Sequence, residues 1–322
     1  DNPLVAAILK WKKLETLVTK YTSKLPLFVN PVTTYIHCDY KNTRTTTGRG
    51  AVGDPPLQQM PARDPDGARI RGSFKAPPGY AFAIADLSMI ELRIMAEKWN
   101  ERNMSKALID GLDLHTLTAA AIKNKVMSSD WLVLGPLYDA LVAAIQAEDK
   151  AAKAARRNAK PANFGLGYGA GVDKFIWIAW KDYGLLWTPE EGRQLRNIWH
   201  ALYPGIGQHH REIGARLRVE KVICVETLGG RKRYCRGYSE ALNADIQGTA
   251  GEIIKRAQNI IGNDLRQVLQ VHDELLVLER EDQVQYALDY MCSALKQAGR
   301  EFLTKVPVEV SGVVADSWIK AG

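Results

Sequence analysis

The chain has 322 residues, of which 46% are hydrophobic, and a formal net charge of +7. This hydrophobic share indicates a globular protein with a buried core and excludes a disordered chain. The four cysteines are scattered, with neither a CxxC pair nor the spacing of a zinc site, so we expect free thiols and no disulfide framework. No apolar stretch approaches the ~20 residues that span a bilayer. The positive charge favours a polyanionic partner without requiring one.

The N-terminal part of the chain predicts one helix followed by irregular structure. Residues 3–25 place apolar side chains three or four positions apart, from Leu4 and Ile8 to Tyr21 and Leu25. This spacing is typical of an amphipathic helix whose apolar face packs on another element. Residues 28–78 are rich in Thr, Gly, Pro and Arg, which predicts loops and short strands.

Two acidic residues stand where predicted strands end. The stretch YAFAIADLSMIELRIMAEKW begins as a buried strand, passes through Asp86 and changes to helical spacing at Ile90. Residues 105–224 are mostly helical in pattern, and another helix covers residues 241–261. The run VLQVHDELLVLER then reads as two strands that meet at a bend containing Asp273. A helix near residues 281–304 and the strand-like VPVEVSGVV close the chain.

Asp86 and Asp273 are together candidates for a metal site. Either acid alone is more often a cap or turn residue. Two carboxylates at adjoining strand ends could share a pair of Mg²⁺ ions, which prefer hard oxygen ligands and bridge to substrate phosphates. Such a site serves phosphoryl transfer.

The segment RRNAKPANFGLGYG combines helical spacing with helix-breaking residues. Arg156, Lys160, Phe164 and Tyr168 follow at intervals of four, so that two cations precede two aromatic rings on one face. The cations suit a triphosphate, and the rings suit a sugar and a base. The alternative is an amphipathic helix with a basic end and two core aromatics. Pro161 removes a backbone donor and should kink the helix or loosen its first turn.

Positive charge gathers near the end of the helical region. Residues 211–236 contain eight Lys or Arg against three Glu and end in the cluster RKR at Arg231 to Arg233. A solvated face would more often interleave the two signs.

Three segments in order give the sequence a specific resemblance. DLSMIELR (residues 86–93), RRNAKPANFGLGYG (156–169) and VHDEL (271–275) resemble motifs A, B and C of the family A DNA polymerases. Matches between them are TGRG (47–50), DPPLQQMPAR (54–63), DLHTLTA (113–119), ETLGGRKRY (226–234) and NADIQGTAGEIIKRA (243–257). The resemblance covers nearly the whole chain.

The resemblance implies roles for individual residues. Metal ligands would be Asp86, Asp273 and the backbone carbonyl of Leu87, holding two Mg²⁺ ions that Mn²⁺ can replace, with Glu274 as an auxiliary acid beside the primer end. Contacts to the triphosphate would be Arg156, His115 and Lys160, which also matches the proton donor to pyrophosphate. Glu91 would exclude a ribose 2′-hydroxyl, and Phe164 and Tyr168 would lie beside the incoming sugar and the templating position. Contacts to primer and template DNA would be Arg49, Gln58, Asn243, Gln247, His272, Arg231 and Arg233. Asn243 and Gln247 could instead satisfy neighbouring backbone, and His115 could be an ordinary core histidine.

The fold implied is α+β, the right-hand polymerase architecture with an antiparallel-sheet palm and helical fingers. Residues 1–30 would be a remnant of the thumb helix, 31–110 and 225–322 the palm with the HDE hairpin, and 111–224 the fingers. The interval from His115 to Lys160 is longer than the family pattern, which predicts an inserted helical element near residues 124–148. The family's exonuclease domain and most of its thumb are expected to be missing.

The function implied is DNA-templated DNA synthesis with release of pyrophosphate, in a phage- or plasmid-type enzyme without proofreading on this chain. Its partners would be primer-template DNA and dNTPs, in the cytoplasm of a bacterial or phage-infected cell, with no membrane. A second chain or an N-terminal region would supply the thumb or exonuclease. Two alternatives stay open: a catalytically degenerate scaffold that binds primer and template, and a single-subunit RNA polymerase, which Glu91 and Glu274 disfavour.

Overall fold

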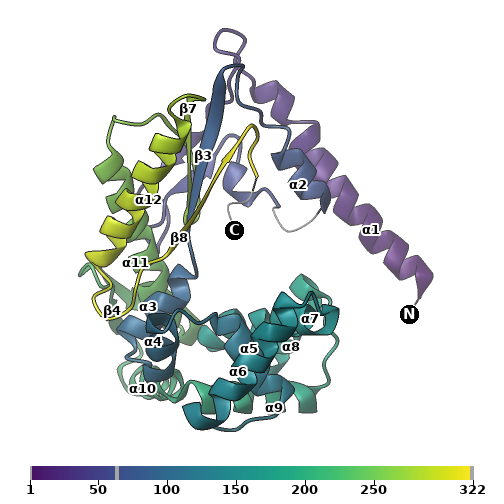
Figure 1. Cartoon of the computed structure of the whole chain (residues 1–322), viewed down its shortest axis with the longest axis vertical. Helices are drawn as coiled ribbons and strands as arrows, with labels where there is room; N and C mark the ends of the chain where they lie inside the picture. Colours follow the sequence, from purple (N-terminus) through teal and green to yellow (C-terminus); the bar gives the residue numbers. More distant parts are fainter. Residues whose placement is uncertain (1, 62–64, 320–322) are drawn as a thin grey trace. The chain divides into compact units, whose positions relative to one another are not determined.

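The structure is a computed structural model that describes residues 2–61 and 65–319, and it divides into two compact units (Figure 1). The first unit contains Asp1–Ser88, Gly251–Gly299 and Glu309–Gly322, and the second contains Met89–Ala250 and Arg300–Val308. Each unit is described by itself. The end of the DPPLQQMPAR motif, at Ala62 and Arg63, lies outside the described residues.

The first unit is built on a four-stranded antiparallel sheet. Its strands, in the order β6-β7-β3-β8, are Gln267–Val271, Glu274–Arg280, Tyr80–Leu87 and Val310–Ala315. β6 and β7 form the hairpin that the sequence predicted around Asp273, and β3 is the strand predicted to carry Asp86. The combination of this sheet with many helices confirms the predicted α+β class.

The sheet is buried on both faces because its central strand β3 carries apolar residues at nearly every position. Phe82 and Ile84 point into a cluster that also contains Leu276, Leu278 and Trp318. Side chains alternate along a strand, so Ala83 and Ala85 belong to the opposite face, where they are also fully buried. Helix α12 (Val284–Arg300) lies beside β3 and β8 (Figure 1).

The packing of α12 on the sheet depends on a glycine in β8. A Cβ atom at Gly312 would lie 2.8 Å from Cδ1 of Leu288 and 3.0 Å from Sγ of Cys292. The missing side chain therefore lets the helix approach the strand.

The N-terminal helix differs from its prediction. Helix α1 covers Pro3–Leu17, and the chain continues as a π-helical turn at Val18–Thr22 and a 3₁₀ turn at Leu25–Phe28. Burial begins only at Leu17 and continues at Tyr21 and Leu25, whereas Leu4 is 65% and Trp11 is 58% exposed. The expectation that the whole apolar face packs on another element was wrong.

The segment between α1 and β3 contains small elements. These are β1 (Asp39–Lys41), β2 (Ala51–Gly53), a 3₁₀ turn (Leu57–Gln59) and helix α2 (Pro65–Arg71). β1 and β2 pair antiparallel, as the expectation of short strands in this region requires. The sequence pattern did not predict α2, which is only seven residues long and too short to show a clear helical period.

The second unit is mainly helical, and its helices begin at residues suited to cap them. They are α3 (Ile90–Lys98), α4 (Arg102–Ile109), α5 (Leu114–Lys123), α6 (Trp131–Gln146), α7 (Lys150–Pro161), α8 (Val172–Tyr183), α9 (Pro189–Leu202) and α10 (Pro204–Glu220). Asp113, Asp130 and Asp149 each accept a hydrogen bond from the first turn of the helix that follows. Thr188 and Glu191 form a reciprocal capping box at α9. Such caps each stabilise a helix by about 1 kcal/mol.

Helix α6 occupies the region where the sequence predicts an inserted element. Its Leu141 is buried in a small apolar cluster with Ala119 and Ala120 of α5 and with Ala152 and Ala159 of α7. The element is therefore integrated into the packing of α5 and α7.

The second unit ends in a hairpin and shares a long helix with the first. β4 (Ile223–Glu226) and β5 (Lys232–Cys235) pair antiparallel, and α11 (Tyr238–Ile261) follows them. α11 belongs to the second unit up to Ala250 and to the first from Gly251. Within the described residues, no helix is both long enough and apolar enough to cross a membrane.

Three histidines on α9 and α10 are held neutral by burial. Burial lowers the pKa of His200, His209 and His210 to about 4 in each case, and the neighbouring Arg196 adds to the effect at His200. His209 stacks on Trp99 with ring centroids 4.6 Å apart, and His210 packs edge-on to the same ring at 5.8 Å. Since an unfolded histidine titrates near 6.5, the unfolded state binds more protons between about pH 6.5 and pH 4.

We therefore expect these histidines to stabilise the fold fully above about pH 6.5 and progressively less as the pH falls toward 4. Replacing His200 by Gln should reduce the slope of unfolding free energy against pH by up to about 1.4 kcal/mol per pH unit in that window. Urea unfolding from pH 7.5 to 4.5 measures this slope. Burial raises the pKa of Asp245 to about 6 and acts in the opposite direction, so the comparison is between variant and wild type. His37→Gln is the control because His37 is exposed, and an equal slope change in both variants would contradict the assignment.

Candidate functional site

The sheet of the first unit brings the two predicted metal-binding acids to neighbouring strand ends. Asp86, near the end of β3, is the register partner of Glu274, the first residue of β7. The backbone N–H of Leu87 donates to the carbonyl oxygen of Asp273 at 3.2 Å. Both acids are half-buried. The antiparallel register therefore places Asp86 and Asp273 side by side although they are far apart in the sequence.

The turn that carries Asp273 is tight and held from behind. His272 has φ of 56°, in the left-handed region, and it joins β6 to β7 in a two-residue turn with Asp273. The side chain of Gln270, 6% exposed, donates through Nε2 to the carbonyl oxygen of His272 at 2.8 Å. Tyr40 contributes its hydroxyl oxygen as acceptor for the backbone N–H of Gln270 at 3.1 Å. These bonds fix the conformation of the turn and leave the His272 side chain exposed.

Glu274 is part of a buried polar cluster. It is 5% exposed, and its Oε1 accepts hydrogen bonds from Nη2 of Arg71 at 2.6 Å and from Nε1 of Trp318 at 3.0 Å. The Arg71 guanidinium also lies over the Trp318 ring, 4.0 Å from its centroid. Burial lowers the pKa of Arg71, whereas Glu274 and Asp86 act to raise it. This cluster ties helix α2 and the C-terminal segment to the start of β7, one residue after Asp273.

The donor atoms at this sheet edge fit hard divalent cations. Two carboxylates and the neighbouring backbone carbonyl of Leu87 supply oxygen ligands only, which Mg²⁺ prefers, and Mg²⁺ completes its shell with water and substrate phosphates. No group of three or more His, Cys, Asp or Glu side chains suited to a metal occurs among the residues described. A site with two protein carboxylates falls below that number.

The nucleotide-binding helix of the second unit changes its winding at Pro161. Helix α7 ends at Pro161, and Ala162–Leu166 form a π-helical turn in which the backbone stays right-handed. Proline has no N–H to donate to the preceding turn, and π turns of this kind recur at functional sites. Arg156 and Lys160 therefore lie on the α-helical part, and Phe164 lies on the π turn.

Arg156 is oriented by an acid at the start of another helix. Its Nε and Nη2 donate to the two carboxylate oxygens of Asp113 at 2.7 and 3.2 Å, a bidentate pair. Asp113 also accepts from the backbone N–H and hydroxyl of Thr116 as the N-cap of α5. Burial alone would raise the pKa of Asp113, but the hydrogen bonds from Arg156 and Thr116 outweigh it and lower the pKa below its ordinary value.

Asn163 connects the π turn to two other helices. It is fully buried, and its Oδ1 accepts from Oγ1 of Thr118 and Nε1 of Trp199, both at 2.9 Å. Its Nδ2 donates to Nδ1 of His115 at 2.9 Å. His115 is itself 5% exposed and packs against Phe164, with ring centroids 5.5 Å apart. The cluster holds His115 and Phe164 together, as the predicted nucleotide site requires.

Glu91 and Tyr168 form a second pair. The Tyr168 hydroxyl donates to Oε2 of Glu91 at 2.6 Å, which joins the first turn of α3 to the chain after the π turn. The glycines on either side of Tyr168 are closely packed. A Cβ atom would lie 3.0 Å from Sδ of Met95 at Gly167, and 2.7 Å from Cε1 of Tyr238 at Gly169, where φ is also 73°.

The predicted DNA-contacting residues divide between the two units. In the first, Gln58 donates through Nε2 to the carbonyl oxygen of Gln270 at 3.2 Å, so it supports the same turn as His272. Gly251 of α11 lets the backbone of Arg49 approach, because a Cβ atom there would lie 3.2 Å from Cα of Arg49.

In the second unit, Asn243 and Gln247 lie one turn apart on α11, and both are half-buried. Oδ1 of Asn243 is buried and has no hydrogen-bond partner within the protein. Arg233 of β5 donates through Nη2 to Oε1 of Glu240 at 2.5 Å, while Arg231 lies just before that strand.

The structure thus brings the predicted residues together within each unit. The first unit contains Arg49, Gln58, Asp86, Leu87, His272, Asp273 and Glu274, and the second contains Glu91, His115, Arg156, Lys160, Phe164, Tyr168, Arg231, Arg233, Asn243 and Gln247. Sequence reasoning missed Arg71, Trp318, Asp113 and Asn163 as supporting residues. The only signal for Asp113 was its position at the start of the DLHTLTA motif, and the other three gave none.

Comparisons with known proteins agree with the resemblance found in the motifs. The model of DNA polymerase family A matches residues 1–130 and 138–320, and the seven unmatched residues lie at the start of α6, where the sequence predicts an insertion. DNA polymerase I of Pseudomonas aeruginosa is 34% identical over 345 residues, which cover 100% of this chain and 34% of that protein. The thermostable DNA polymerase I of Thermus filiformis is 31% identical and matches 99% of this chain and 37% of its own length.

A solved structure supports the same assignment. The POL domain of Pol1 from M. smegmatis, in complex with DNA primer-template and dNTP, superposes with a TM-score of 0.74 at 28% identity, covering 93% of this chain and 50% of that one. The fold is that of a polymerase domain, as the resemblance predicts. The chain spans about a third of the length of the curated relatives it matches. With the family model matching nearly all of its residues, the chain belongs to DNA polymerase family A.

Proposed function

We propose that this chain acts as a DNA-templated DNA polymerase that adds deoxynucleoside monophosphates to a primer 3′ end and releases pyrophosphate. The observation that carries the proposal is the register of β3 and β7, which places Asp86 and Asp273 at neighbouring strand ends. The family to which the chain belongs and the ordered Arg156, Lys160, Phe164 and Tyr168 support it.

In the proposed reaction, Asp86, Asp273 and the carbonyl oxygen of Leu87 hold two Mg²⁺ ions. When bound, the ions supply Lewis acidity for the attacking primer hydroxyl and for the charge that develops on the departing pyrophosphate. Arg156 binds a phosphate oxygen in the orientation that Asp113 sets, and His115 provides a further phosphate contact. Lys160 donates the proton that the pyrophosphate takes up. The buried Glu274 positions the start of β7 and so supports Asp273.

Selection of the nucleotide would depend on the cluster around the π turn. Glu91, held by the Tyr168 hydroxyl, excludes a ribose 2′-hydroxyl, and Phe164 and Tyr168 lie against the sugar and the templating base. Asn243, Gln247, Arg49, Gln58, His272, Arg231 and Arg233 are the proposed contacts to primer and template. The unpartnered Oδ1 of Asn243 supports its place in this group, since a buried acceptor requires a donor.

The substrates of the proposed enzyme are primer-template DNA and dNTPs. The M. smegmatis neighbour was solved with both, and the curated relatives are bacterial DNA polymerase I proteins. We propose a cytoplasmic role in DNA replication, with a thumb or exonuclease function supplied by a second chain or an N-terminal region. A phage or plasmid origin and the division into thumb, palm and fingers remain predictions.

Primer extension tests the proposal directly. The protein is given a labelled primer on four templates that differ only in the templating base, together with an equimolar mixture of ribo- and deoxyribonucleotides and Mg²⁺. We expect addition of the complementary deoxynucleotide on each template and stoichiometric release of pyrophosphate. Binding of primer-template without incorporation would instead identify a scaffold. Preferential incorporation of ribonucleotides would identify an RNA polymerase.

A further inference from the structure

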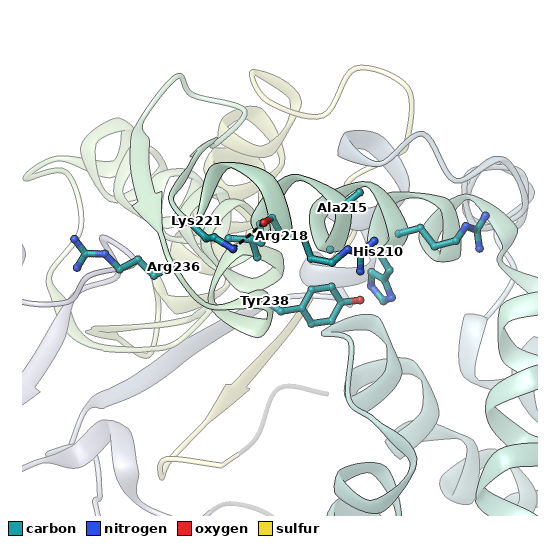
Figure 2. Close-up of a pocket in the computed structure, with 9 residues that line it drawn as sticks. His210, Ala215, Arg218, Lys221, Arg236 and Tyr238 are labelled. Carbon is teal, nitrogen blue, oxygen red and sulfur yellow. Dashed lines mark hydrogen bonds between the residues drawn. The ribbon is translucent and has the colours of Figure 1, made fainter.

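A groove on α10 carries positive charge that the proposed chemistry does not use. Its cavity volume is about 840 Å³, and its lining comes from α10, the chain just after β5 and the start of α11. Figure 2 shows Lys221 and Arg218 toward one end of the helix and His210 beside the Tyr238 ring. Its lining cations are Arg211, Arg218, Lys221 and Arg236. None of the residues that line the groove in the described part of the chain is acidic.

These cations are available to a ligand. All four side chains are exposed, and no carboxylate among the described residues forms an ion pair with their side chains. Nζ of Lys221 donates only to a backbone carbonyl, that of Arg218, at 2.9 Å. The neighbouring Arg216 differs, because it pairs with Glu220 at 2.9 Å outside the groove. Uncompensated cations along one side of a helix favour a polyanion.

The groove continues to the nucleotide-binding helix of the same unit. A second cavity of about 320 Å³ shares His210, Arg211 and Tyr238 with the first and adds Arg196, Gly169 and Ala170 to the lining. Nε2 of His210 donates to the carbonyl oxygen of Gly167 at 3.0 Å, and Gly169 packs against the Tyr238 ring. One end of the groove therefore lies at the residues that follow Tyr168, and the other end lies at Lys221.

We infer that this groove, called here the α10 groove, binds the sugar-phosphate backbone of single-stranded nucleic acid, in the form of the unpaired template strand. The inference rests on the proposed function, since Tyr168 is the residue proposed beside the templating base. From His210 to Lys221 the helix rises about 16 Å, enough for four or five phosphates at about 3.4 Å each along a stacked strand. Arg and Lys bind the phosphates, and the Tyr238 ring offers a face on which a base stacks, a combination used by proteins that bind single strands.

Fluorescence anisotropy with a labelled 12-nucleotide single-stranded DNA tests this inference between 50 and 200 mM salt. Arg211→Gln/Arg218→Gln is expected to weaken binding about ten-fold at 50 mM salt and to reduce the slope of log affinity against log salt by about 1.4, at about 0.7 per lost phosphate contact. Lys221→Gln/Arg236→Gln should give the same change. The matched control is Arg193→Gln/Arg216→Gln, which removes the same charge from exposed, ion-paired positions of the same unit and should bind as the wild type does.

A second arm separates this inference from the proposed function. On a primer-template with a two-nucleotide template overhang, the groove variants should extend the primer as the wild type does. On a twelve-nucleotide overhang, their KM for primer-template should rise. Unchanged affinity and salt slope in both groove variants would overturn the inference, whether or not the protein polymerises. Equal displacement of the oligonucleotide by poly-glutamate of the same length would also overturn it, because the groove would then serve an acidic polypeptide.

Discussion

Asparagine in place of Asp86 or Asp273 is expected to lower the rate of nucleotide incorporation at least about 1,000-fold. The carboxylates hold the proposed metal ions, whose charge stabilisation contributes several kcal/mol to the transition state, and each tenfold in rate corresponds to about 1.4 kcal/mol. Asparagine has nearly the same shape, and the backbone bond from Leu87 to the carbonyl oxygen of Asp273 does not involve the side chain. The folded structure should therefore be retained in both variants.

Single-turnover primer extension at saturating dNTP measures this effect, and thermal unfolding checks the fold. Asp316→Asn is the matched control, since Asp316 is an exposed acid of the same unit that pairs with Lys75. It should retain wild-type activity. Chelation of divalent ions should abolish synthesis by the wild type, and added Mg²⁺ or Mn²⁺ should restore it. Equal residual synthesis by the wild type and both aspartate variants would refute the proposed site.

Methionine in place of Arg71 is expected to lower the free energy of unfolding by about 3–5 kcal/mol, the typical cost of removing one partner of a buried ion pair. The side chains of Arg71 and Glu274 are each 6% exposed, so the substitution would leave a carboxylate buried without its counter-charge. The Trp318 indole would still donate to Glu274, but a neutral donor compensates only part of the lost charge.

A double-mutant cycle with Arg71→Met and Glu274→Gln isolates the pair. The double variant should regain much of the lost stability, because neither member then carries an uncompensated charge. Lys75→Met is the matched control, since it breaks an exposed ion pair of the same unit that solvent screens, and it should change the stability little. Urea unfolding measures all four proteins. Equal effects of Arg71→Met and Lys75→Met would show that the buried pair does not hold the start of β7.

The sequence alone was enough for features that depend on near neighbours. The strand through Asp86, the hairpin around Asp273 and the helical stretch before Phe164 all follow from spacings of two or of three to four residues, and the structure contains each of them. The motif order was also visible in the sequence, and with it the family. The disturbance that Pro161 causes was expected, but its form, a π turn over five residues, was not.

Other features depend on partners that are distant in the sequence. Arg71 and Glu274 are 203 residues apart, and Trp99 and Asp245 are 146 apart. No local pattern distinguishes Arg71 from an exposed arginine, and Asn163 resembles any polar residue within a helix. The apolar stripe of α1 shows the opposite error, because periodicity predicts which face is apolar but not whether another element covers it.

The sequence by itself therefore determined the order of the elements, the acids and cations of the proposed reaction, and the family. Local spacing and side-chain chemistry fix these features before the chain folds. Only the tertiary structure decided which residues support them: Arg71 and Trp318 behind Glu274, Asp113 at Arg156, and Asn163 beneath His115. Strand register and helix packing determine those contacts, because they join segments whose separation along the chain carries no information about their distance in space.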